Sequence, residues 1–288
     1  MTASPTLFPE LIPVNVSRVP QRSPFRYPGG KTWFVPYLRA WLGSLPVRPR
    51  LYLEPFVGGG SLACTVLAEN LADQVQIVEL DEDVVSVWQT IFSDAAPILA
   101  QQISEFDLTA DSVDLALERP TPTTLQRAFQ TILRNRVNRG GILAPGAGRL
   151  KTGENGRGLL SRWYPETLAR RILALHAHQE RVTVIHGDGL AQLQCLDSPT
   201  TASLLDPPYT AGGKGAGSRL YRHSELDHER LFALAAELCG AFLLTYDDAP
   251  EVRSMTKRQA LNCRAVAMKS THHAQLTELV IGRDLGWL

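Results

Sequence analysis

Apolar residues along the chain occur in two patterns, short continuous runs and longer stretches with helical spacing. Residues 51–53 and 75–80 are short runs of the kind found in buried strands. Between them lie a glycine turn and a helical stretch at 61–71, with Ser61 in the position of an N-cap. A strand, glycine loop, helix and strand within about 30 residues form a βαβ unit, which predicts a parallel sheet. We therefore expect an α/β fold.

The same pattern returns in the C-terminal half of the chain. Apolar runs at 182–185, 203–205, 241–245 and 276–282 predict further strands, and periodic apolar positions predict helices at 31–45, 83–92 and 226–238. The middle differs, because its helical stretches at 123–137 and 165–180 flank a glycine-rich segment with few core residues. We expect an extended, proline-broken arm at 1–24, a sheet domain at 25–100 and 179–288, and an inserted helical module at 101–178.

The composition, with 44% hydrophobic and 20% charged residues, excludes a mainly disordered or fibrous chain. The four cysteines lie far apart and form no CxxC pair, so we expect reduced thiols and no metal site. No apolar run reaches the roughly 18 residues that a membrane span needs, which favours a cytoplasmic protein.

Charge is unevenly distributed although the net charge is zero. Residues 73–118 contain many acidic side chains and no lysine or arginine, whereas 134–171 are rich in arginine. A neutral protein can bind a polyanion through one such cationic segment, and a merely solvated basic surface is the alternative.

A glycine turn and one acidic position, Glu79, predict a nucleoside site, with a helix-capping acid as the structural alternative. The turn runs from Glu54 through Gly58 to Gly60 directly after a strand, where glycines allow close approach of a ligand to the backbone. Glu79 ends the next strand, about 20 residues further on, where an acid can accept hydrogen bonds from ribose hydroxyls. The third glycine of a dinucleotide fingerprint is absent, which argues against a dinucleotide oxidoreductase.

The strongest chemical signal is Asp206-Pro207-Pro208-Tyr209, which follows a buried strand. The two prolines stiffen the chain, while the Asp206 carboxylate and the Pro207 carbonyl can accept both hydrogens of an exocyclic amine. Tyr209 offers a ring on which a planar base can stack. A proline corner with a capping aspartate is the structural alternative.

The motifs together resemble the Dam-like family of adenine-N6 DNA methyltransferases. The resemblance rests on residues 25–31 (FRYPGGK), residues 54–61 (EPFVGGGS) and residues 206–209 (DPPY). It implies a Rossmann-like methyltransferase fold, with a seven-stranded, mostly parallel sheet and an inserted DNA-recognition module. It also implies S-adenosylmethionine as methyl donor. By matched position, the cofactor contacts would be Tyr27, Gly30, Lys31, Glu54, Pro55, Phe56, Gly58, Gly60, Glu79, Asp188 and Asp206.

The resemblance implies double-stranded DNA as the partner, reached by extruding an adenine from the duplex. Catalysis would rest on Asp206, Pro207, Pro208 and Tyr209. A cognate restriction endonuclease, a nucleoid-associated location and a monomer or weak dimer are further expectations. Asn135-Arg136 resembles the start of the family's recognition signature, although residues 137–141 depart from it. The expected DNA contacts are Arg134, Asn135, Arg136, Arg139, Arg149, Lys151 and Arg157.

Two rival functions remain open at this point. The same chemistry could act on cytosine N4, on RNA or on a protein amide, or the chain could be a catalytically silent nucleic-acid-binding module. The glycine-rich loop at 211–218 could close over an extruded base or be a plain connector.

Overall fold

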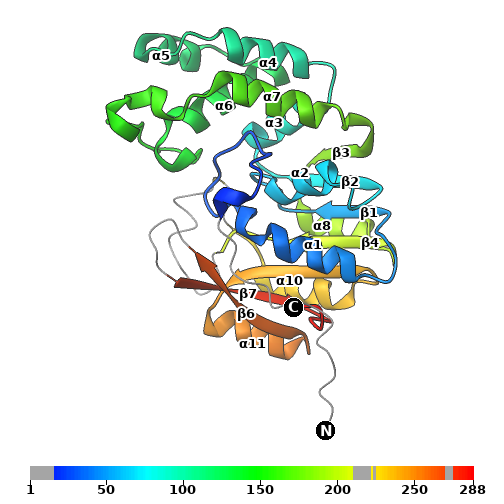
Figure 1. Ribbon diagram of the computed structural model, residues 1–288. Coiled ribbons are helices and arrows are strands. Elements are labelled where there is room, and N and C mark those ends of the chain that lie inside the picture. The colour runs from blue at the N-terminus through cyan, green and yellow to red at the C-terminus, as the bar shows by residue number, and fades with distance from the viewer. Residues whose placement is uncertain (1–15, 210–221, 223–224, 270–274) are drawn as a thin grey trace.

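The protein is described by a computed structural model in which residues 16–209, 222, 225–269 and 275–288 are placed. Its centre is one seven-stranded sheet in the order β3-β2-β1-β4-β5-β7-β6 (Figure 1). The strands are β1 (Leu51–Glu54), β2 (Gln74–Glu79), β3 (Val182–His186), β4 (Thr201–Leu205), β5 (Ala241–Asp247), β6 (Asn262–Lys269) and β7 (Gln275–Gly282). Strands β1 to β5 run parallel, and β7 is antiparallel to both of its neighbours. The predicted α/β fold with a mostly parallel sheet is confirmed.

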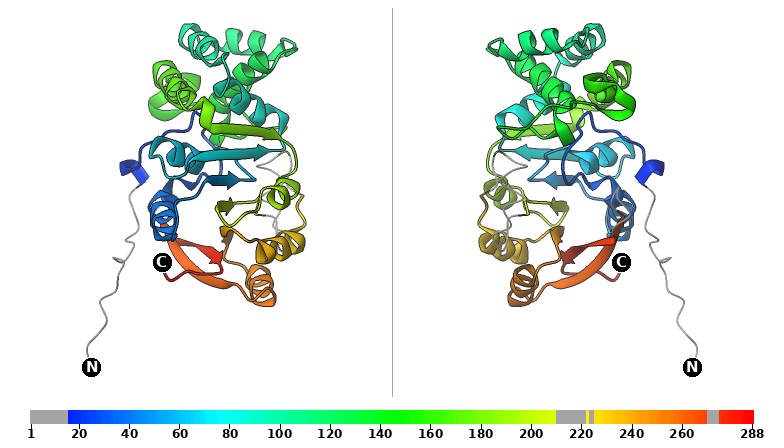
Figure 2. Two further views of the ribbon diagram at one scale, coloured as in Figure 1. Left: turned by 90° about the vertical axis from the view of Figure 1, so that its right-hand side faces the viewer. Right: turned by 90° about the vertical axis from the view of Figure 1, so that its left-hand side faces the viewer.

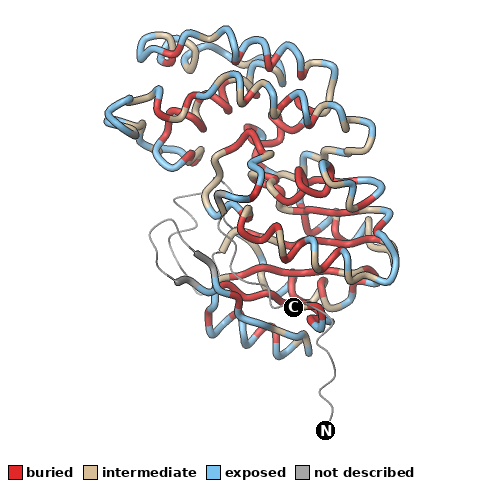
Figure 3. Tube along the Cα trace, viewed as in Figure 1, coloured by how far each residue is buried: buried red, intermediate tan, exposed pale blue. Residues whose placement is uncertain are grey.

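Alternate residues of the central strands point to opposite faces of the sheet, and each face has its own core. Leu204 and Leu243 belong to the core on one face, whereas Leu205 and Leu244 belong to the core on the other. This two-sided burial explains why β1, β4 and β5 contain consecutive apolar residues, at 51–53, 204–205 and 241–244, rather than alternating ones. The buried strands stand out against the exposed outer surfaces of the helices in Figure 3.

Helices cover both faces, as the two side views show (Figure 2). On one face lie α1 (Val35–Ser44), α2 (Ser61–Ala68) and α3 (Glu82–Ile91). On the other lie α8 (Gly189–Cys195), α10 (His228–Glu237) and α11 (Pro250–Arg258). Within the described ranges, none of the helices is both long enough and apolar enough to cross a bilayer.

Four helices between α3 and β3 project beyond the β3 edge, at the top of Figure 1. They are α4 (Ala96–Glu105), α5 (Ala110–Glu118), α6 (Thr124–Val137) and α7 (Pro165–His176). Helix α6 packs on α3 and α7 packs on α4. Their buried residues, among them Ile132 and Ile172, are continuous with the core on the α3 side of the sheet. The module predicted at 101–178 therefore shares that core, and its boundaries stay a prediction.

Several local expectations differ from the structure. Ser61 is not an N-cap: that position is held by Gly60 at φ +57°, and no side chain caps α2. The helix predicted from residue 31 begins as a 3₁₀ turn, Lys31–Phe34, before α1. The helix predicted at 226–238 starts only at His228, because the Asp227 side chain accepts from the Arg230 N–H and caps it there. Residues 1–15 of the expected arm and the loop at 211–218 lie outside the described residues.

Candidate functional site

The carboxyl ends of the parallel strands bring the predicted acidic residues to one edge of the sheet. Glu54 ends β1, Glu79 ends β2, and Asp206 directly follows β4. Because β1 pairs with both β2 and β4, these three positions are neighbours at the edge where the strand order reverses. Open α/β sheets bind ligands in the crevice at such a switch point. The glycine turn and the proline corner thus lie on the same side of the molecule.

Asp206 is held by three donors on a single oxygen. Its Oδ1 lies 3.0 Å from Lys31 Nζ and accepts hydrogen bonds from Tyr209 Oη at 2.9 Å and from Thr245 Oγ1 at 2.7 Å. Every contact of this carboxylate within the described part of the chain ends on Oδ1. A carboxylate has acceptor capacity on both oxygens, so Oδ2 keeps its own for a ligand.

Lys31 is the cation of the site and only 4% exposed. Its ammonium lies between two carboxylates, 3.0 Å from Asp206 Oδ1 and 3.2 Å from Glu278 Oε2. Burial lowers the pKa of Lys31, but the charges of Asp206 and Glu278 outweigh it, and the pKa is raised above its usual value. Lys31 is therefore charged at neutral pH. Its expected contact with a cofactor stays a prediction.

Glu278 on β7 was not predicted from the sequence. It is 4% exposed, and its Oε2 is reached by Lys31 Nζ and by Tyr209 Oη at 3.3 Å. Burial raises the pKa of Glu278 to about 7, and Lys31 opposes that rise only in part. One signal could have revealed this residue, namely a lone acid inside the apolar run of β7.

The ring of Tyr209 packs inside the site. It stacks on Tyr246, with ring centroids 5.5 Å apart, and Lys31 Nζ lies 4.7 Å from its centroid. The Tyr246 hydroxyl in turn is 2.9 Å from His228 Nδ1. Stacking of a nucleobase on Tyr209 remains a prediction, and in this structure the hydroxyl of the ring is engaged by the two carboxylates.

The glycines of the turn make room for aromatic side chains. A Cβ at Gly58 would lie 2.7 Å from the Tyr27 ring, and one at Gly60 would lie 2.6 Å from the Trp88 ring. Gly58 and Gly60 also have φ of +44° and +57°, which other residues adopt with strain. Trp88 Nε1 donates to the Gly58 carbonyl at 3.0 Å. The turn is therefore rigid, with Tyr27 placed against it.

Glu79 organises the loop that follows β2. Its Oε2 accepts from the Gly58 N–H, and its Oε1 accepts from the N–H groups of Leu80 and Asp81, all at 2.9 Å. Burial raises the pKa of Glu79, while these backbone donors act in the opposite direction. Three bonds leave part of the acceptor capacity of the carboxylate for a ligand.

Glu54 is buried beneath the site. Its Oε2 accepts from the Ala63 N–H at 2.9 Å, and Tyr52 Oη lies 3.4 Å away. Burial first, and then the charge of Asp206, raise the pKa of Glu54 to about 8. Glu54 therefore holds a proton at neutral pH and ties β1 to the first turn of α2.

The turn after β3 lies against the glycine turn. A Cβ at Gly189 would come within 2.2 Å of the Pro55 carbonyl oxygen and 3.0 Å of the Phe56 ring. The neighbouring Asp188 is exposed and caps α8 by accepting from the Leu190 N–H at 2.9 Å. Asp188 is thus a capping residue at the start of α8, and its contact with a cofactor stays a prediction.

The structure separates the seven predicted DNA contacts into three groups. Arg139, Lys151 and Arg157 are exposed and available to a polyanion. Arg134 and Arg149 form ion pairs with Asp83 and Asp114. The remaining two, Asn135 and Arg136, are buried.

Asn135 and Arg136 were expected at the DNA because they resemble the recognition signature, whereas in the structure both side chains are buried, and their contact with DNA stays a prediction. Asn135 Oδ1 accepts from the Arg26 N–H at 2.8 Å, and its Nδ2 donates to the carbonyls of Arg26 at 2.8 Å and Gly141 at 2.7 Å. Arg136 donates to the Pro24 carbonyl. These two side chains fix the segment that leads into Tyr27 and Lys31.

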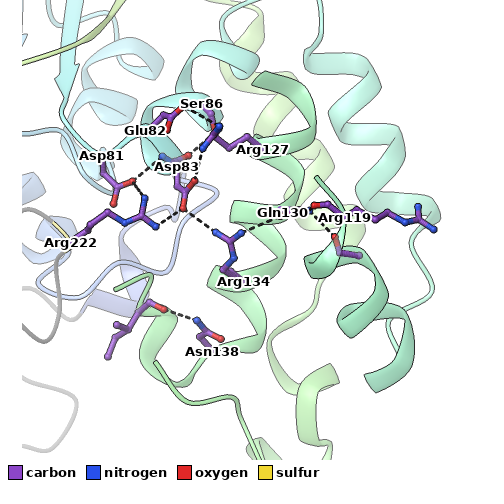
Figure 4. Close-up of polar contacts among 12 residues, drawn as sticks. Asp81, Glu82, Asp83, Ser86, Arg119, Arg127, Gln130, Arg134, Asn138 and Arg222 are labelled. Atoms are coloured by element: carbon purple, nitrogen blue, oxygen red, sulfur yellow. Dashed lines mark hydrogen bonds and ion pairs between the residues drawn. The ribbon is translucent and has the colours of Figure 1, made fainter. Parts of the chain in front are cut away.

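Asp83 at the start of α3 is the centre of an ion-pair cluster (Figure 4). Its carboxylate is contacted by Arg134 at 3.0 Å, Arg222 at 2.8 Å and Arg127 at 3.5 Å. Arg222 also lies 3.5 Å from Asp81. The cluster joins α6 and position 222 to the loop organised by Glu79.

No protein-family profile and no curated protein sequence matches the chain. Among solved structures, an Escherichia coli protein assigned as methyltransferase yhhF is 13% identical with a TM-score of 0.38, covering 86% of this chain and 83% of that one. The Pyrococcus horikoshii protein PH1948, assigned as an RNA methyltransferase, is 12% identical with a TM-score of 0.38, covering 91% and 85%. The methyltransferase domain of bacterial CtHen1-CN is 9% identical with a TM-score of 0.31, covering 85% and 98%.

Likenesses this distant carry no argument about function, so the fold is assigned from the sheet itself. Five parallel strands, the order 3-2-1-4-5-7-6 and the single reversed strand β7 define a Rossmann-like methyltransferase fold. The expected fold class is confirmed.

Proposed function

We propose that the protein is a DNA methyltransferase that transfers a methyl group from S-adenosylmethionine to the N6 amine of an extruded adenine. The observation that carries the proposal is the set of hydrogen-bond and ion-pair partners of the Asp206 carboxylate. Lys31, Tyr209 and Thr245 all bind its Oδ1, which fixes the carboxylate; none of the described residues contacts Oδ2, which would accept from a substrate amine. The Pro207 carbonyl, on the next residue, is the second acceptor that such an amine needs.

The residues around the glycine turn fit the proposed cofactor. Glu79 keeps acceptor capacity for ribose hydroxyls, the half-buried Phe56 ring lies close to Gly189, and Tyr27 lies against the turn. The carboxylates of Asp206 and Glu278 give this edge an excess of negative charge, which suits a cationic sulfonium. When bound, S-adenosylmethionine would supply an electrophilic methyl group.

An adenine amine is a weak nucleophile because its lone pair is delocalised into the ring. Asp206 Oδ2 and the Pro207 carbonyl would accept its two hydrogens and favour a pyramidal nitrogen. This arrangement works by positioning and electrostatics and requires no covalent intermediate. The carboxylate would also accept the proton that the nitrogen loses after methylation.

A base inside a duplex cannot reach this edge, so it has to be extruded, which costs a few kcal/mol. Stacking on an aromatic ring such as Tyr209 contributes about 1–3 kcal/mol per base and would offset part of this cost. Arg139, Lys151 and Arg157 are exposed on the projecting module and would bind phosphates.

The test uses the purified protein and methyl-labelled S-adenosylmethionine with double-stranded DNA of mixed sequence, and with RNA in a parallel reaction, followed by mass spectrometry of the released nucleosides. We expect N6-methyladenine in DNA from the wild type and none from Asp206→Ala, with Asp111→Ala on the exposed face of α5 as the matched control. Label found only in N4-methylcytosine, only in RNA, or in no nucleic acid would overturn the proposal.

A further inference from the structure

Glu278 has a place in the site that no sequence motif assigned. It lies in the middle of β7, opposite Asp247 of β5 and Val266 of β6, and is 4% exposed. A buried carboxylate is costly unless it is paired and hydrogen-bonded. Its partners are therefore informative about its role.

Those partners are shared with Asp206. Lys31 Nζ lies 3.0 Å from Asp206 and 3.2 Å from Glu278, and Tyr209 Oη lies 2.9 Å and 3.3 Å from the same two carboxylates. One ammonium and one hydroxyl thus bridge two acids. Asp206 has the shorter contacts and a third donor in Thr245.

This asymmetry determines which acid accepts a proton. Two carboxylates around one ammonium carry an excess negative charge, and like charges in one site disfavour joint ionisation. Among the described residues, the charged and titratable groups that face Glu278 are Lys31, Asp206 and Tyr209, together with Asp247 across the strand pair, whose charge also disfavours ionisation of Glu278. Glu278 has the longer contacts of the two acids, so it is the one that takes up the proton.

We propose that Glu278 is a positioning residue for methyl transfer: when ionised, it shares Lys31 and the Tyr209 hydroxyl with Asp206 and so keeps Asp206 a strong acceptor for the substrate amine. When Glu278 is protonated, Lys31 and the Tyr209 hydroxyl interact with Asp206 alone and neutralise the charge of its carboxylate. This inference rests on the proposed function, because it needs a transfer reaction in which Asp206 binds the amine.

Because Asp206 and Glu278 share Lys31 and Tyr209, kcat should depend on the protonation of Glu278 and therefore on pH. Burial places the pKa of Glu278 at about 7, so the ionised form dominates above that pH. In the wild type, kcat should therefore rise as the pH passes through about 7. Glu278→Gln resembles the protonated state and should lack this rise.

The experiment measures kcat, the KM for DNA and the dissociation constant of S-adenosylmethionine between about pH 6 and pH 9. Over this range the acidic and the basic side of the pH–rate profile can be separated. For Glu278→Gln we expect kcat at pH 8 to fall about tenfold. A tenfold change corresponds to a shift of about one pKa unit in how strongly Asp206 accepts a hydrogen bond. We expect both binding constants to stay within about twofold and the rise near pH 7 to disappear. Glu278→Asp keeps a carboxylate and should restore part of the rise of kcat near pH 7. The matched control is Glu251→Gln on the exposed face of α11.

Each outcome is decisive. A wild type that transfers no methyl group refutes the proposed function itself. A wild type that is active without a rise near pH 7, or a Glu278→Gln that keeps the rise and the rate, refutes the role of Glu278 alone. If Glu278→Gln fails to fold, as judged by melting and cofactor binding, Tyr209→Phe decides the matter. This variant lacks the shared hydroxyl, so we expect a smaller rise of kcat near pH 7 than in the wild type, and an equal rise would refute the role of Glu278.

Discussion

The buried Lys31 and the partly buried Asp206 form an ion pair of 3.0 Å that joins the 3₁₀ turn before α1 to the corner after β4. The pair makes the PGGK segment and the DPPY segment parts of one site, although most of the chain lies between them.

Replacing the cation should destabilise the fold in a pH-dependent way. Lys31→Met leaves Asp206 and Glu278 facing each other without a counter-charge, and removal of one partner of a buried pair costs about 3–5 kcal/mol. Protonation of a carboxyl relieves the repulsion, so the loss measured by urea unfolding should be smaller at about pH 5.5 than at about pH 8. Lys31→Met combined with Glu278→Gln should recover stability. An equal loss at both pH values would contradict this account.

Removing the Asp206 carboxylate should lower the rate of methyl transfer far more than the affinity for S-adenosylmethionine. Asp206→Asn keeps the size of the side chain but loses its charge, so the rate of methyl transfer should fall by about 10³-fold or more, as for other preorganised electrostatic groups. The affinity for S-adenosylmethionine, measured by titration calorimetry, should change far less. A variant with near-normal turnover would refute the assignment of Asp206.

Glu54 should make stability depend on pH. Its pKa in the folded protein is about 8, above the ordinary 4.5, so between these values the folded state holds a proton that the unfolded chain releases. The free energy of unfolding should therefore fall as the pH rises from about 4.5 to about 8, by up to about 1.4 kcal/mol per pH unit. Glu54→Gln should flatten this slope in urea titrations, whereas Glu251→Gln should not. The same slope in Glu54→Gln and the wild type would contradict the assignment.

Asn135 should support the site from within the projecting helices. Asn135→Ala removes three hydrogen bonds to the backbone of Arg26 and Gly141. The bond to the Gly141 carbonyl is buried and its loss costs about 1–3 kcal/mol, whereas the two part-buried bonds to Arg26 contribute less. We expect a lower melting temperature and weaker cofactor binding, because Arg26 leads directly into Tyr27 and Lys31. Gln101→Ala, on an exposed position of α4, is the control. Unchanged cofactor affinity in a folded Asn135→Ala would refute the positioning role.

The exposed and the paired arginines should behave differently toward DNA. Arg157→Ala, and separately Lys151→Ala, should reduce the slope of log affinity against log salt by about 1, as expected for loss of one phosphate contact. Arg134→Ala should instead lower thermal stability, since it removes an ion pair from Asp83. Salt titrations followed by fluorescence anisotropy measure the first effect. An unchanged slope in both exposed variants would place the DNA elsewhere.

The sequence was sufficient to predict the central strands because burial on both faces makes them plain apolar runs. Strand β6 was missed, since it is an edge strand whose exposed polar residues interrupt the apolar pattern. Helix α11 was missed for a related reason, as most of its residues are polar and only Val252, Met255 and Thr256 are buried.

The site was predictable only as far as local motifs extend. Asp206, Tyr209 and Lys31 lie in short motifs and were found, whereas Glu278 joins them through strand pairing across the sheet. The buried positions of Asn135 and Arg136 depend on tertiary packing as well. At Gly141, whose φ is +75°, a Cβ would lie 2.1 Å from the Arg26 carbonyl oxygen, a close approach that no local pattern reveals.

The central claim is that the glycine turn and the Asp206 corner form one site in which a methyl donor faces an extruded adenine. The most direct measurement is a crystal structure with a non-reactive S-adenosylmethionine analogue and duplex DNA. We predict that the adenine N6 lies within hydrogen-bond distance of Asp206 Oδ2 and the Pro207 carbonyl, and about 3–3.5 Å from the position of the methyl group. An adenine still stacked in the duplex, or a cofactor bound away from Glu79 and Phe56, would contradict the account.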